Sequence, residues 1–65
     1  MKYYFLTIDG AKMDTPRKCA HVGTETSAEE LARTLLHEEK FADVVTITEQ
    51  ENGKIVSEIY KIYSK

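Results

Sequence analysis

SAEELARTLLHEE, residues 27–39, is the stretch that decides the fold class. Its apolar residues recur with the three- and four-residue spacing of one helix face, at Ala28, Leu31, Ala32, Leu35 and Leu36. Ser27 and Glu30 have the spacing of a capping box, which predicts that the helix starts at Ser27. We expect the helix to end near Glu39, with Phe41 packing back against it.

Two β-rich segments lie on each side of this helix. Residues 2–8 form one strand and end at the turn signal Asp9-Gly10, and residues 17–24 form a weaker strand after a loop. On the other side lie residues 42–50 and 55–63, which are separated by an Asn-Gly turn. Such a turn predicts a hairpin, because both of its central residues must adopt positive φ.

The last segment is ambiguous, because the apolar residues of 55–63 also fit a helical stripe. The Asn-Gly turn and the β-branched and aromatic content favour a strand. The sequence therefore predicts an α+β fold in the order β-β-α-β-β. A single amphipathic helix packs on a three- or four-stranded antiparallel sheet, and residues 1–65 form one small domain.

Length and composition limit what such a domain can be. Its 65 residues bury little surface on folding, and its single cysteine, Cys19, forms no disulfide within the chain. The content of 42% hydrophobic and 31% charged residues is that of a folded protein, and the net charge of −2 creates no basic field. No apolar run has the length of a membrane span or a signal peptide, so we expect a cytoplasmic protein without membrane association.

The strands carry more apolar side chains than one helix can cover. Alternation predicts that Tyr4, Leu6, Ile8, Val45 and Ile47 face the helix. Large apolar groups then remain for the opposite face, and an exposed apolar patch of this kind usually marks an interface. The residues that we expect at this interface are Tyr3, Phe5, Val44, Tyr60 and Tyr63.

Few residues could support catalysis or metal binding. Cys19 and His21 are two apart on a predicted strand, which places both side chains on one face, as in half of a metal site or a thiol–base pair. Zinc requires four ligands, or three and a water molecule, and only His37, Asp9 and Asp14 could add to the pair. Nothing positions a third group for a nucleophilic cysteine. We therefore expect no metal, no cofactor and no enzymatic activity.

Three functions compete, and the first is a non-enzymatic interaction module. This module would form a homodimer, or bind another protein, through the open sheet face. The second is a single-stranded nucleic-acid-binding protein, in which tyrosines stack on bases and cations line the sheet. These cations are Lys2, Lys12, Arg17, Lys18, Lys54, Lys61 and Lys65.

The net charge and the absence of an RNP motif argue against nucleic acid. The third function is an acidic mimic that docks on a basic surface. Residues 27–52 carry seven acidic and two basic groups. Proteins that mimic nucleic acid, however, usually have a far more negative net charge than the −2 of this chain.

Overall fold

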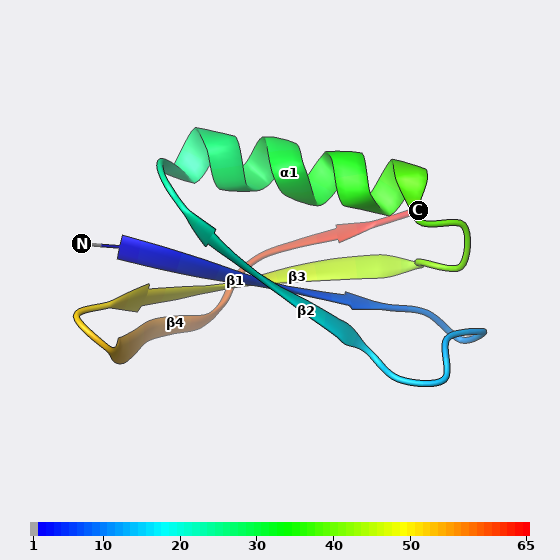
Figure 1. The fold of residues 1–65 in the computed structure, drawn as a ribbon, viewed down its shortest axis with the longest axis horizontal. Coiled ribbons are helices and arrows are strands. Elements are labelled where there is room, and N and C mark those ends of the chain that lie inside the picture. Colours follow the sequence, from blue (N-terminus) through cyan, green and yellow to red (C-terminus); the bar gives the residue numbers. More distant parts are fainter. Residues whose placement is uncertain (1) are drawn as a thin grey trace.

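The computed structural model describes residues 2–65, which form a four-stranded antiparallel sheet with one helix along one face (Figure 1). The elements in chain order are β1 (Lys2–Asp9), β2 (Arg17–Val22), α1 (Glu25–Glu38), β3 (Val44–Glu51) and β4 (Lys54–Ser64). The strand order across the sheet is β2-β1-β3-β4, so β1 and β3 lie at its centre. The predicted fold class and element order are confirmed.

The Asn-Gly turn forms the expected hairpin between β3 and β4. Asn52 and Gly53 have φ angles of 52° and 80°, and Glu51 pairs with Lys54 across the turn. The segment that also fitted a helical stripe is therefore a strand, 11 residues long. Its pairing with β3 is irregular, with register shifts around Glu49.

The helix begins earlier than the sequence indicates. Its N-cap is Thr24, whose side chain accepts a hydrogen bond from the amide of Ser27, while Ser27 Oγ accepts one from the amide of Thr24. The prediction that the helix starts at Ser27 is wrong, because the reciprocal pair forms one turn earlier, with Ser27 in the place usually taken by Glu or Gln. The helix ends at Glu38, one residue before the predicted position.

The core lies between the helix and the two central strands. The five strand residues that were predicted to face the helix, Tyr4, Leu6, Ile8, Val45 and Ile47, are each at most 1% exposed. The helix contributes Ala28 and Ala32, which are fully buried, and its three leucines pack at the margins of this cluster. Small side chains at the centre of the contact let the helix backbone lie close to the sheet.

Phe41 departs from the prediction, since it is 50% exposed and does not pack back on the helix. Its neighbour Ala42 is fully buried in its place. The amide of Ala42 donates to the carbonyl of Glu39, and this turn directs Phe41 outward. The structure thus leaves a large aromatic side chain in solvent at one end of the sheet.

Candidate interaction surface

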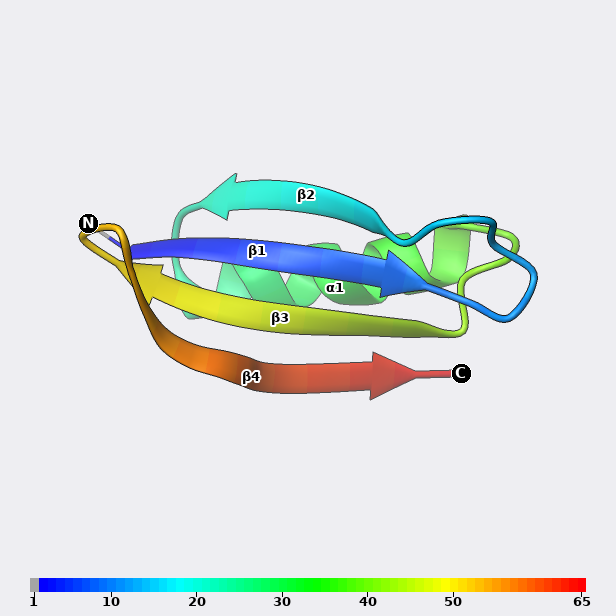
Figure 2. The ribbon, with the colours of Figure 1, turned by 90° about the horizontal axis from the view of Figure 1, so that it is seen from below.

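The face of the sheet opposite the helix is uncovered (Figure 2). Residues that are paired across adjacent strands project to the same face, so the strand registers define rows of side chains. Four rows lie on this face, and together we call them the open face. The first row is Val22, Tyr3, Gln50 and Ile55, and the second is Ala20, Phe5 and Thr48. The third row is Lys18, Thr7, Thr46 and Ile62, and the fourth is Asp9, Val44 and Ser64.

Large apolar side chains are exposed on the open face. Val22, Ile55 and Ile62 are 54–56% exposed, and Tyr3 and Phe5 are half-buried between their neighbours. A shallow hollow crosses the first three rows, and it is lined by Phe5, Thr7, Lys18, Thr48, Gln50 and Ile55. Threonines lie between the apolar groups, so the surface is apolar with interspersed hydroxyl groups.

Charges are scarce on the open face and concentrated on the helix side. Lys18 and Asp9 are the only charged residues in the four rows. The ion pairs of residues 2–65 lie on the helix side: Lys2 with Glu49 at 3.5 Å, Lys61 with Glu29 at 3.5 Å, and Arg17 with Glu39. The cations that were considered for nucleic-acid binding are therefore mostly directed away from Tyr3 and Phe5.

Three of the five predicted interface residues lie on the open face, although they are spread along it from the first row to the fourth. Tyr3, Phe5 and Val44 lie on the open face as expected. Tyr60 and Tyr63 lie on the helix side, where both pack against the core, so their predicted placement on the open face is corrected. Residues 58–60 of β4 lie opposite Thr48 alone, and this bulge ends the strict alternation of the strand.

Both of these tyrosines interact with the helix. The hydroxyl of Tyr63 donates to Glu29 Oε1 at 2.9 Å, and the ring centre of Tyr60 lies 5.9 Å from that of Tyr4. The nearby carboxylate of Glu25 on the helix, together with desolvation, raises the pKa of Tyr60 to about 12. Desolvation and the bond to Glu29 raise the pKa of Tyr63. The tyrosines of β4 thus attach this edge strand to the helix.

Sequence reasoning did not include Ile55, Ile62 and Val22 in the interface. Ile55 could have been placed, because a two-residue turn at Asn52-Gly53 sets Gln50 opposite Ile55. Ile62 could not, because its face depends on the bulge in β4. Val22 belongs to the row of Tyr3, which requires knowledge of the register between β1 and β2.

Cys19 and His21 share the helix side of β2, where they lie opposite Leu6 and Tyr4. His21 Nε2 lies 2.8 Å from Ser27 Oγ, and Cys19 Sγ contacts the carbonyl of Ala20 at 3.7 Å. No group of three or more potential metal ligands exists within residues 2–65. His21 thus interacts with Ser27, the third residue of the helix, which forms the reciprocal pair with the N-cap Thr24.

Comparison with protein-family models, with curated proteins and with solved structures found no match to this chain. Within the described part of the chain, the helix is too short and too polar to cross a membrane.

Proposed function

We propose that this protein is a non-enzymatic interaction module that forms a homodimer by packing two open faces together. The observation that carries the proposal is the open face itself. All four strands contribute apolar side chains to it, and only two charged residues lie in its rows. Burial of such a surface is favourable, and it leaves few charges to be desolvated.

The size of the open face suits a reversible homodimer. Four strands of about eight residues give a footprint of roughly 500 Å² at ordinary strand spacing and rise. Two such faces would bury on the order of 1,000 Å², which is the lower limit of specific interfaces. A second copy would also supply the apolar burial that a domain of this length lacks. We therefore expect dimers that dissociate on dilution.

Nucleic-acid binding on the same face has weaker support. Tyr3 and Phe5 offer rings for stacking, but Lys18 is the one cation in the rows around them. Affinity for nucleic acid depends on cations that neutralise phosphates. Lys2, Arg17 and Lys61 are paired with acids on the other side of the sheet.

The test is solution mass by light scattering over a concentration series. The wild-type chain should change from monomer to dimer as its concentration rises. Val22→Lys and Ile62→Lys introduce charge at positions that are 56% exposed, so they should keep the fold and shift the transition to higher concentration. Thr34→Lys makes the same kind of change on the exposed helix surface and should leave the transition unchanged.

A wild-type chain that remains monomeric at millimolar concentration would contradict the proposal. So would dimers that Val22→Lys and Ile62→Lys leave intact. Salt-sensitive binding of a single-stranded oligonucleotide that is lost in Phe5→Ala, with the mass unchanged, would support the nucleic-acid alternative instead.

A further inference from the structure

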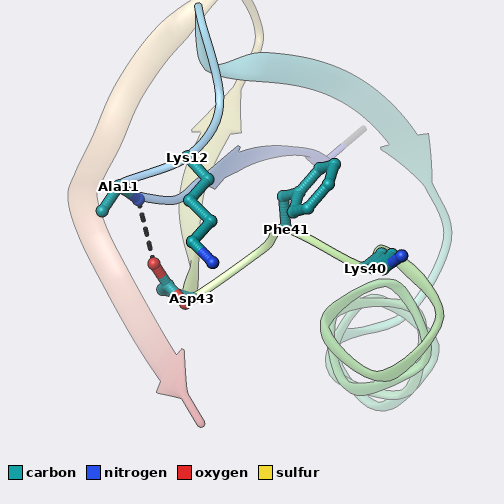
Figure 3. Close-up of a pocket in the computed structure, with 5 residues that line it drawn as sticks. All are labelled: Ala11, Lys12, Lys40, Phe41 and Asp43. Atoms are coloured by element: carbon teal, nitrogen blue, oxygen red, sulfur yellow. Dashed lines mark hydrogen bonds between the residues drawn. The ribbon is translucent and has the colours of Figure 1, made fainter.

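Two turns meet at one end of the sheet and form a small hollow between them (Figure 3). It is lined by Ala11, Lys12, Lys40, Phe41 and Asp43, and its volume is about 280 Å³. This volume lies just below the usual range of small-molecule sites. The space therefore suits one small ligand, and it is too small for a dinucleotide or another large cofactor.

Each turn is braced by its own backbone hydrogen bond. In the first turn the amide of Met13 donates to the carbonyl of Gly10 at 3.0 Å. In the second turn the amide of Ala42 donates to the carbonyl of Glu39 at 3.2 Å. These bonds fix the backbone conformation of both turns, and the side chains at their tips project from it.

The two turns are also locked together. The amide of Ala11 donates to Asp43 Oδ2 at 2.9 Å, as Figure 3 shows. Gly10 approaches Phe41 so closely that a Cβ on Gly10 would lie 1.9 Å from the Phe41 carbonyl oxygen. The relative position of Lys12 and Phe41 is therefore set by the backbone and does not depend on a ligand.

An exposed aromatic ring and two lysines occupy this junction. Phe41 is 50% exposed, and Lys40 Nζ lies 5.7 Å from its ring centre. In Figure 3 the Lys12 side chain extends into the space between Asp43 and Phe41. The hollow thus combines a face for stacking with a cation beside it.

Three acids near the hollow already accept hydrogen bonds or form an ion pair, whereas neither lysine is paired with an acid among the described residues. Asp9 accepts from the amide of Gly10 at 2.7 Å, Asp43 accepts from Ala11, and Glu39 pairs with Arg17. Neither Lys12 nor Lys40 takes part in an ion pair within residues 2–65. Both ammonium groups are therefore available to an anion.

We propose that this hollow binds a nucleotide, with the base stacked on Phe41 and the phosphate held by Lys12 and Lys40. Aromatic side chains stack on every base, and a lysine ammonium binds phosphate as a point charge. The site shares no residue with the open face, so it is independent of the proposed dimer.

The test is a titration of the ¹⁵N-labelled chain with adenosine monophosphate, followed by amide chemical shifts. Shifts should centre on residues 10–13 and 39–43, and adenosine or inorganic phosphate alone should bind at least fivefold more weakly. Lys12→Ala, Lys40→Ala and Phe41→Ala should each weaken binding at least threefold. Lys54→Ala, at the hairpin on the opposite end, is the matched control and should bind as the wild type does.

A short oligodeoxynucleotide identifies the source of the nucleotide. If the oligodeoxynucleotide binds more tightly than the monophosphate and shifts the same amides, the ligand is a nucleic-acid strand. If the two bind equally, the ligand is a free nucleotide. No shifts at ten millimolar monophosphate would overturn the proposal. So would shifts centred on the open face, or binding that survives both Lys12→Ala and Phe41→Ala. The three substituted side chains are exposed, and circular dichroism checks that each variant is folded.

Discussion

The hydroxyl of Tyr63 donates a hydrogen bond of 2.9 Å to Oε1 of Glu29, which joins the last strand to the helix. Lys61 Nζ lies 3.5 Å from the same oxygen, and the guanidinium of Arg33 lies 5.9 Å from the ring centre of Tyr63. The bond from Tyr63 is the main reason why the pKa of Glu29 lies below its ordinary value. One carboxylate thus ties an edge strand to the helix.

Replacing Tyr63 with Phe should reduce the loss of stability that the chain shows when the pH is lowered. Because the folded chain lowers the pKa of Glu29, its contribution is present above pH 4.5 and is lost as the pH falls. Tyr63→Phe should therefore be less stable than wild type near neutral pH, and the two urea midpoints should converge in acid. Tyr3→Phe, on the open face, is the control. A difference between Tyr63→Phe and wild type that is the same at neutral and acid pH would contradict this role.

Alkaline pH should loosen the attachment of β4 to the helix. A folded pKa near 12 for Tyr60 means that its contribution is complete below pH 10 and is lost as the pH rises toward 12. The pKa values of Tyr4 and Tyr63 are raised as well, mainly by desolvation. We expect urea midpoints to fall between pH 10 and pH 12, over the same range in which the absorbance of tyrosinate rises. Tyr60→Phe should show a smaller fall, and an equal fall would argue against the interaction of Tyr60 with Glu25.

The layer beneath the helix follows from short-range patterns in the sequence. Alternation along two strands correctly placed Tyr4, Leu6 and Ile8, and then Val45 and Ile47, in the core. The pair Asn52 and Gly53 correctly predicted the hairpin, because few other residues accept positive φ at both positions. These features were predictable because each depends on residues that are neighbours in the chain.

The faces of Tyr60 and Tyr63 were not predictable in the same way. They are three residues apart, which places them on opposite faces of a regular strand, yet the bulge opposite Thr48 brings both under the helix. No glycine or proline within β4 marks this irregularity. The helix start was missed because Thr24 and Ser27 are both good caps, and only the folded chain shows which one forms the reciprocal pair.

Two glycine substitutions should separate steric crowding from backbone strain. At Gly10 an added Cβ meets the Phe41 carbonyl oxygen at 1.9 Å, so Gly10→Ala must shift one of the two turns and should destabilise the fold by about 1–3 kcal/mol. At Gly53 nothing lies within 4 Å, and the φ of 80° is the only obstacle. Gly53→Ala should therefore lose about 1–2 kcal/mol, the penalty of a left-handed residue.

Chemical denaturation measures both losses, and amide shifts tell them apart. Gly10→Ala should shift residues 40–43, whereas Gly53→Ala should shift only the hairpin. Unchanged signals from residues 40–43 in Gly10→Ala would show that the two turns are not locked together.

A pair of identical substitutions should distinguish the core from the open face. Ile47 is fully buried, so Ile47→Val should destabilise the monomer by about 0.5–1.5 kcal/mol. Ile62 is 56% exposed, and Ile62→Val should change the stability of dilute chain by less than about 0.5 kcal/mol. Removing the same methylene from a proposed interface should instead move the monomer–dimer transition to higher concentration. Equal losses of stability in dilute solution would mean that Ile62 is already covered within the monomer, and the open face would then lack one of its main apolar contacts.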